Sequence, residues 1–189
     1  MGEDVCRGTF EREVLPHLDA AYNLAHWLIG SRQHAEDIVQ EAYALAFLFF
    51  PSFRGRDTRV WLMRIVRDTC FAWLYVNRSS ADAAEVERNP FRLVSQVPEA
   101  QELGIRNLSG TVMREALQKL SPSFREVLIL RELEGMSYSE IAEITGRPTG
   151  AVLSSLSCAR ELLRHALTGL LNSQPEGGCE RSDPSGGSA

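Results

Sequence analysis

The segment from Ser52 to Arg78 constrains the fold most, because its apolar residues recur at the spacing of an α-helix. The helix is expected to begin near Thr58 or Arg59, with Asp57 or Thr58 as its cap. The side chains predicted to face a core are Leu62, Ile65, Val66, Thr69, Trp73 and Val76. This segment is therefore predicted to be a long helix with one face packed against the rest of the protein.

A second face of the same helix is basic and carries aromatic rings at helical spacing; its residues are Arg64, Arg67, Phe71, Tyr75 and Arg78. The loop before the helix adds Arg54, Arg56 and Arg59 around Gly55. Cations can hold phosphates, and flat rings can stack on unpaired bases. The face therefore fits either a single strand of nucleic acid or, as many charge runs do, solvent with two half-buried rings.

The composition is that of an ordinary globular protein, with 44% hydrophobic and 24% charged residues among 189. The formal net charge of -5 argues against a uniformly basic protein that coats DNA. It does not exclude DNA binding, because a local basic patch is sufficient. Such a patch is present, since the stretch from Arg54 to Arg67 holds five arginines and one acid.

The sequence lacks the patterns of several other protein classes. The four cysteines are scattered, so no metal site is expected. There is no glycine-rich phosphate loop and no nucleophile motif, so neither a cofactor nor an enzymatic activity is expected. No signal peptide is recognised, and no apolar run is long enough to cross a bilayer. We therefore expect a cytoplasmic protein that does not insert into a membrane.

Two helices are predicted before the basic segment. Apolar residues repeat from Phe10 to Ile29, with Pro16 expected to start or bend this helix and Gly30 to end it. A second helix is expected over 31–50, with a core stripe opposite a polar face that includes Asp37, Gln40 and Glu41. That face serves either solubility or the docking of a basic partner.

Helical periodicity is lost after the basic segment and then returns, which divides the chain into four parts. We predict an N-terminal domain over 1–80 and a flexible, mildly acidic linker over 81–110. A second helical domain follows over 111–172, and a disordered tail rich in Gly, Ser and Pro over 173–189.

The second domain has the pattern of a helix-turn-helix. Ser137 and Glu140 are spaced as a capping box, Gly146 lies in a tight turn, and the last helix opens at Pro148 and Thr149. In such a motif the second helix enters the major groove by its N-terminal residues. The side chains expected to face DNA are Arg147, Thr149, Leu153, Ser154, Ser157 and Arg160.

Three parts of the chain resemble bacterial sigma factors of the extracytoplasmic-function (ECF) class, in the sigma-70 superfamily. The family's promoter-melting segment is similar to SFRG followed by WLMRIVRDTCFAWL, within Ser52–Arg78. Its polymerase-binding helix is similar to the run from His34 to Tyr43, and its C-terminal helix-turn-helix to the run from Leu120 to Arg160. The three motifs occur in the family's order, which makes the resemblance specific.

The resemblance implies an all-α protein with two small domains, sigma region 2 over 1–80 and sigma region 4 over 111–172. The implied partners are core RNA polymerase and promoter DNA, with the first domain reading the −10 element and the second the −35 element. The residues implied for polymerase binding are Asp37, Gln40 and Glu41. Those implied for the −10 region are Phe53, Arg54, Arg56, Arg59, Arg64, Arg67 and Phe71, with a pocket for a flipped base in the loop from Phe53 to Val60.

The chain departs from the family pattern in two places. The family has arginines where this chain has Leu45 and Leu48, so this helix end is apolar nearly all round and should be covered, by the chain itself or by an anti-sigma factor. The family also has basic residues where this chain has Ser155 and Cys158. Binding of the recognition helix is therefore expected to depend less on phosphate charge than is usual.

We interpret the chain as an alternative sigma factor that an anti-sigma factor holds inactive. One alternative is a sigma-like mimic that titrates an anti-sigma factor and never opens DNA; the missing arginines favour it and the intact Arg54–Arg67 patch opposes it. A simple repressor or activator that uses only the helix-turn-helix would leave residues 10–78 unexplained.

Overall fold

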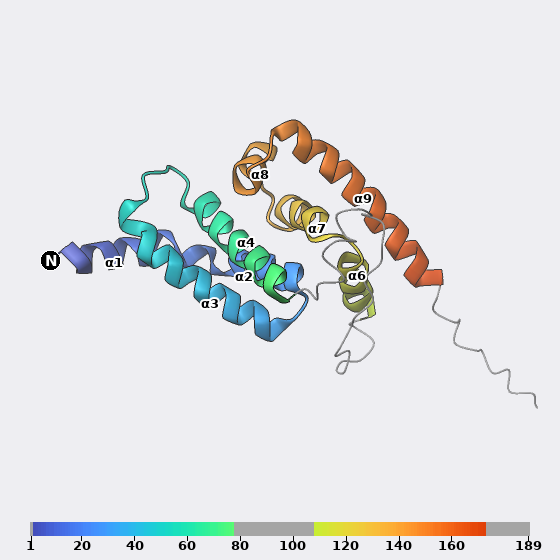
Figure 1. Cartoon of the computed structure of the whole chain (residues 1–189), viewed down its shortest axis with the longest axis horizontal. Helices are drawn as coiled ribbons and strands as arrows, with labels where there is room; N and C mark the ends of the chain where they lie inside the picture. Colours follow the sequence, from blue (N-terminus) through green and yellow to red (C-terminus); the bar gives the residue numbers. More distant parts are fainter. Residues whose placement is uncertain (1, 78–107, 173–189) are drawn as a thin grey trace, which may run out of the picture.

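The computed structural model describes residues 2–77 and 108–172, and every regular element in these two ranges is a helix (Figure 1). The N-terminal domain contains α1 (Gly2–Glu13), η1 (Leu15–His17), α2 (Leu18–Ile29), α3 (Arg32–Phe49), η2 (Phe50–Ser52) and α4 (Thr58–Asn77). The C-terminal domain contains α6 (Leu108–Gln118), α7 (Pro122–Leu128), η4 (Ile129–Leu133), α8 (Tyr138–Thr145) and α9 (Thr149–Asn172). The prediction of two small all-α domains is confirmed.

Two of the predicted segments fall largely outside the described residues. The predicted tail over 173–189 and the part of the predicted linker over 81–107 lie outside the described residues. The remaining linker positions lie in α6, which begins at Leu108 and so before position 111.

The N-terminal domain packs α2, α3 and α4 around one core, and its helix boundaries follow from local chemistry. The first apolar run breaks around Pro16 into α1, η1 and α2, and α2 ends at Gly30, whose φ of 80° is left-handed. The helix α4 begins where expected, because Asp57 Oδ1 accepts a hydrogen bond from the backbone N of Val60 at 3.0 Å. Its buried residues are Val60, Leu62, Met63, Val66, Thr69 and Cys70.

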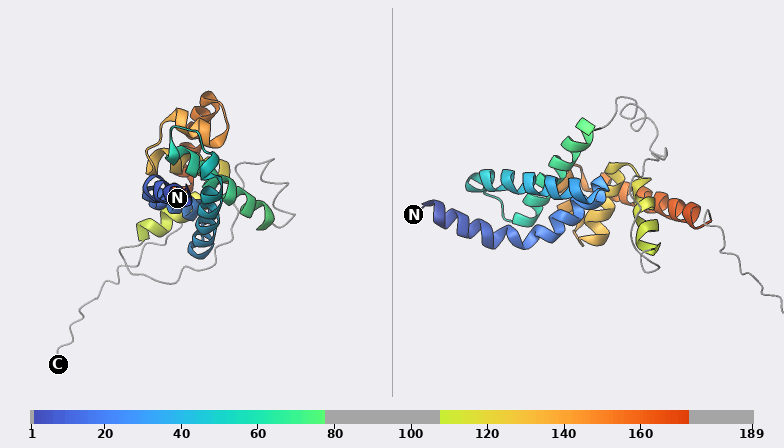
Figure 2. Two further views of the ribbon diagram at one scale, coloured as in Figure 1. Left: turned by 90° about the vertical axis from the view of Figure 1, so that its left-hand side faces the viewer. Right: turned by 90° about the horizontal axis from the view of Figure 1, so that it is seen from below.

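One predicted core residue of this domain is exposed. Val76 was expected to face the core together with Leu62, yet its side chain is 78% exposed. The last turns of α4 project beyond the other described helices of the domain (Figure 2), and Val76 lies in the last of these turns. Helical periodicity places a residue on a face but does not say where the neighbouring helices end.

In the C-terminal domain the predicted capping box and the glycine turn of the helix-turn-helix are present. Ser137 and Glu140 form the capping box, with Ser137 Oγ accepting from Glu140 N at 3.2 Å and a Glu140 carboxylate oxygen accepting from Ser137 N at 2.6 Å. Gly135 and Gly146 both have a φ of 66°, in the left-handed region that favours glycine.

The helix α7 continues into a π-helical turn, η4, which changes the register of the residues that follow. The backbone N of Glu134 donates to the carbonyl of Ile129 at 3.1 Å, five residues back instead of four. Leu133, the last residue of this turn, is 53% exposed. The spacing of a uniform α-helix does not hold across such a turn.

The two domains lie against each other, with α2 beside α7 and α4 beside α8 (Figure 1). A buried arginine, Arg125 of α7, crosses this boundary and donates to backbone carbonyls of both domains. In α2 it reaches the carbonyl of Leu28 at 2.6 Å; in its own domain it reaches those of Leu117 and Leu120, both at 2.9 Å. Carbonyls in the last turns of helices lack helical partners and favour a cation. Arg125 therefore fastens α7 to the end of α2.

Candidate nucleic-acid interface

The predicted polymerase-binding residues form one exposed face of α3. Asp37, Gln40 and Glu41 are all exposed, while Ile38 and Val39, between them in sequence, are buried. Neither Asp37 nor Glu41 forms an ion pair with another described residue. Both carboxylates are therefore available to a basic partner.

The loop before α4 folds over an aromatic cluster. The ring of Phe53 lies 4.6 Å from that of Trp61, centroid to centroid, and packs beside Phe50. A Cβ at Gly55 would lie 2.5 Å from the Phe53 ring, so only glycine allows this close approach. Arg54 supports the loop by donating to the carbonyls of Pro51 and Phe53, at 2.7 and 2.9 Å.

The predicted basic surface is divided by the contact between the domains. Arg56 and Arg64 are exposed and face solvent, and Arg54 is exposed while it also braces the loop. Arg59 and Arg67 instead reach across to the C-terminal domain. The guanidinium carbon of Arg67 also lies 4.6 Å from the centre of the Phe71 ring, so these two residues of the predicted face contact each other.

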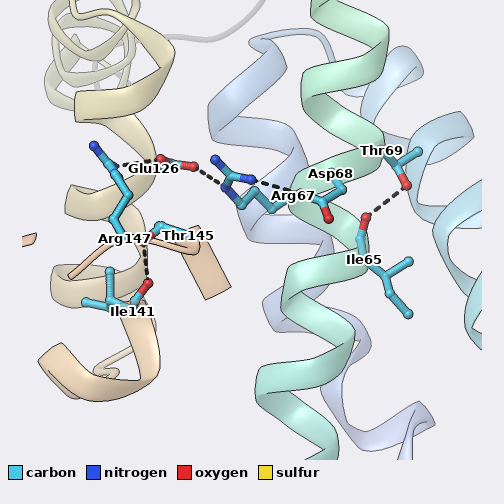
Figure 3. Close-up of polar contacts among 8 residues, drawn as sticks. All are labelled: Ile65, Arg67, Asp68, Thr69, Glu126, Ile141, Thr145 and Arg147. Carbon is cyan, nitrogen blue, oxygen red and sulfur yellow. Dashed lines mark hydrogen bonds and ion pairs between the residues drawn. The ribbon is translucent and has the colours of Figure 1, made fainter. Parts of the chain in front are cut away.

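Arg67 meets a buried carboxylate, that of Glu126 in α7 (Figure 3). Arg67 Nε donates to Glu126 Oε2 at 2.7 Å, and Arg147 Nη2 donates to Glu126 Oε1 at 2.9 Å. The Glu126 side chain is 1% exposed. Its burial raises the pKa of this carboxyl, and the two guanidinium groups oppose that rise. A carboxylate so buried is costly unless it is paired, and here each oxygen has its own arginine.

Sequence reasoning missed Glu126, although one signal pointed to it. Glu126 lies with Arg125 between the apolar residues Phe124 and Val127, in a helix whose residues from Arg125 to Leu128 are all buried. An acid inside such a run indicates a partner of opposite charge. Glu134 was missed as well: its carboxylate pairs with Arg59 at 3.0 Å and accepts from Asn23 at 3.1 Å.

The predicted recognition face of the helix-turn-helix is exposed on α9. Thr149, Leu153, Ser154 and Ser157 lie on this face without any cation among them. Arg160 is exposed and pairs with Glu132 of η4. The predicted residue Arg147 is half-buried and bound to Glu126, as described above.

The two positions where the family carries basic residues lie at the edge of the exposed face. Ser155 and Cys158 are both half-buried, and Arg147 Nη1 donates to Ser155 Oγ at 3.5 Å. Ser155 is thus turned toward the domain boundary as well as toward solvent. The recognition face is polar and nearly uncharged, as the sequence indicated.

The end of α3 carries an apolar surface. Leu48 is 68% exposed and Leu45 is half-buried, and Phe47 and Phe49 beside them are exposed. The described chain therefore does not itself cover Leu48.

Two absences apply to the described ranges. No group of three or more His, Cys, Asp or Glu side chains is placed to hold a metal ion there. Nor does any described helix have the length and apolar character to cross a membrane. Cys70 is buried, which raises the pKa of its thiol to about 12 and leaves it a packing residue.

Comparison with known proteins decides the family. The Sigma-70 region 2 model matches residues 14–79, and the Sigma-70 region 4 model matches residues 111–163. The sigma factor YlaC of Bacillus subtilis is 30% identical over 167 residues, which cover 88% of this chain and 91% of YlaC. The ECF sigma factor SigE of Mycolicibacterium smegmatis is 27% identical over 166 residues, 88% of this chain and 64% of SigE.

The chain belongs to the ECF class of the sigma-70 family. The described ECF fold is similar to that of RpoE from Bartonella quintana, solved in complex with the anti-sigma factor NepR, with a TM-score of 0.62 and 27% identity. That match covers 85% of this chain and 97% of RpoE. The chain spans about half to two thirds of the length of the mycobacterial sigma factors that it matches. Sigma factors are transcription initiation factors and not enzymes in the usual sense.

Proposed function

We propose that this ECF sigma factor directs promoter-specific transcription initiation as a subunit of RNA polymerase, in the cytoplasm and without enzymatic activity of its own. One observation carries the proposal: an acidic face on α3, unpaired among the described residues, and an exposed basic segment on the loop and α4 lie in one domain. The first provides a docking edge for polymerase, through Asp37, Gln40 and Glu41. The second provides cations and rings for the −10 strand.

The loop between Phe53 and Val60 is the proposed site of the flipped base. Melting requires no covalent step; it requires that a base leave the stack, at a cost of a few kcal/mol that a protein pocket offsets. Gly55 allows the backbone to lie against the Phe53 ring, so the loop is already shaped without DNA. Arg54, Arg56 and Arg64 then stand at its edge to hold phosphates.

The proposal is tested by transcription in vitro with core polymerase on a library of promoters. A sigma factor yields transcripts from a defined subset. A mimic that only titrates an anti-sigma factor, which the nearly uncharged recognition face favours, would yield none. Transcription that starts without the added protein would also contradict the proposal.

Removal of the exposed arginines is expected to impair promoter opening. Arg56→Ala with Arg64→Ala removes two exposed cations that form no ion pair with a described residue, so the fold should be unaffected. Each single-strand phosphate that an arginine no longer neutralises lowers the log–log salt dependence of binding by about 0.7. Permanganate reactivity of the opened thymines should therefore fall, because fewer cations hold the opened strand.

Arg12→Ala provides the control for this pair, because Arg12 is equally exposed on α1 and far from the basic segment in sequence. Polymerase binding should be unchanged in all variants. Normal thymine reactivity in the double variant would show that these cations contact only solvent.

The apolar surface around Leu45 and Leu48 is proposed as the seat of an anti-sigma factor. Large exposed apolar patches commonly mark protein–protein interfaces. Phe47, Leu48 and Phe49 are exposed here, and the similar RpoE was solved with an anti-sigma factor. Leu48→Arg should therefore let transcription escape inhibition by extract from the protein's own cells. Leu171→Arg, at another exposed leucine, is the control. Equal inhibition of both variants would place the inhibitor elsewhere.

A further inference from the structure

We propose that the free protein holds itself in a closed, self-inhibited state by an acid clamp, formed by Glu126 and Glu134 of the C-terminal domain. The clamp engages Arg59, Arg67 and Arg147, which are three of the arginines predicted to contact promoter DNA. The inference rests on the proposed function, because it assigns these arginines to DNA in the open protein.

The first half of the clamp joins the two DNA-reading domains through one carboxylate. Glu126 Oε2 accepts from Arg67 of α4 at 2.7 Å, and Glu126 Oε1 accepts from Arg147 of the helix-turn-helix at 2.9 Å. Figure 3 shows Glu126 between the two guanidinium groups. One acid thereby occupies a predicted −10 arginine and a predicted −35 arginine at the same time.

The second half of the clamp lies where α4 begins. Arg59 Nη2 donates to both the backbone carbonyl and the carboxylate of Glu134, at 2.9 and 3.0 Å. Asn23 of α2 donates to the other carboxylate oxygen at 3.1 Å. The side chain of Glu134 is buried, so this contact is shielded from solvent. Both acids come from the segment of α7 and η4, which faces the N-terminal domain.

A carboxylate and a phosphate make the same demand on an arginine, since both accept charge-assisted hydrogen bonds in a planar fork. The nitrogen atoms of Arg67 and Arg59 that donate to Glu126 and Glu134 therefore cannot donate to DNA while the domains remain closed. The contact of Arg147 with Glu126 lies within the C-terminal domain and is released by removal of the acid. The arginines outside the clamp, among them Arg56 and Arg64, stay exposed. The closed protein thus keeps a weak attraction for DNA but lacks the cations nearest the domain boundary.

The clamp differs in kind from the contact that Arg125 makes across the same boundary. Arg125 binds backbone carbonyls of α2 and takes up no predicted DNA contact. Removing the acids alone should therefore release the DNA-contacting arginines without destroying the packing of either domain. The clamp can therefore be tested in the full chain without removing the contacts of Arg125.

The test compares Glu126→Gln with Glu134→Gln, together and singly, against the unchanged protein. Glutamine keeps the size of each side chain and removes its charge. Glu143→Gln is the matched control, because Glu143 is an exposed acid of the same domain and forms no ion pair with a described residue. Small-angle X-ray scattering reports the separation of the domains, and fluorescence anisotropy reports binding of a labelled oligothymidine strand. Circular dichroism confirms that each variant is folded.

The double variant is expected to have a larger radius of gyration than the unchanged protein. It should also bind oligothymidine about tenfold more tightly, because the open form that binds DNA is a minor fraction of the unchanged protein. Glu143→Gln should change neither quantity. If the double variant loses helicity, the single Glu134→Gln variant should show the same two changes in smaller degree. A radius unchanged in every folded variant would overturn the clamp, and opening without tighter DNA binding would overturn self-inhibition.

Failure of the clamp is distinguishable from failure of the proposed function. An open double variant that binds oligothymidine tightly but supports no transcription with core polymerase would leave the clamp standing and remove the sigma activity. The opposite result is also possible. If the unchanged protein supports transcription and the acid substitutions change neither the radius of gyration nor the DNA affinity, the sigma activity would stand and the clamp would be removed.

Discussion

Replacing Arg125 with methionine is expected to destabilise the protein by about 3 kcal/mol or more. Methionine matches the length of the buried stem but removes the side-chain donor from the carbonyls of Leu28 and Leu120, and from that of Leu117, which keeps only its bond from Leu120 N. Each acceptor left unpaired in the interior costs about 1–3 kcal/mol, less what water or a shift of the backbone recovers. For a chain of this size the melting temperature should fall by roughly 10 °C.

Thermal unfolding followed by circular dichroism measures this effect, and Arg32→Met is the control. Arg32 is exposed and pairs only with Glu36 one helical turn away, so its removal should change stability by less than about 0.5 kcal/mol. Arg125→Lys should fall between the two, because an ammonium has fewer donors and no fork. Equal melting temperatures for the two methionine variants would mean that the carbonyls find other partners.

Reversing the charges of Asp37 and Glu41 to lysine is expected to weaken binding to core polymerase by roughly 100-fold. A like charge placed against a basic docking surface costs several kcal/mol, and about 1.4 kcal/mol corresponds to each tenfold change in affinity. Both side chains are exposed on α3, so the fold should tolerate the change. The two lysines repel each other at the same spacing as the two acids did, so helicity should stay constant.

The matched control reverses Glu143 and Glu161, two exposed acids of the C-terminal domain. Affinity for core polymerase is measured by competition with a labelled reference sigma factor. A comparable weakening in both double variants would indicate general electrostatic attraction and not a docking face on α3.

Much of the fold could be predicted because its boundaries are set by short-range chemistry. Gly30 ends a helix in the left-handed conformation, Asp57 caps α4, and Ser137 with Glu140 forms a capping box; each depends on neighbours within a few positions. The prediction of Val76 as a core residue failed for a reason that such neighbours do not encode. Val76 lies in the last turn of α4, which projects beyond the other described helices of its domain.

The candidate site could be predicted only as a set of residues, not as an arrangement. The acidic face around Asp37 and the exposed cations Arg56 and Arg64 follow from helical spacing, which also placed Arg67 on the basic face of α4. That Arg67 meets Glu126 depends on how two domains pack across a sequence separation of 59 residues, and periodicity carries no information about that. The roles assigned to these residues remain predictions.

The contrast between Arg125 and its neighbour Glu126 has a consequence for recombination between sigma genes. Arg125 recognises main-chain carbonyls at the end of α2, which a helix of any sequence presents. Glu126 requires an arginine at one particular position of α4. A hybrid gene that joins this C-terminal domain to the first domain of a relative would therefore still bring the two halves together. It would leave Glu126 without its partner in that domain unless the relative also had an arginine at the position of Arg67, so selection should keep these two positions matched within one gene.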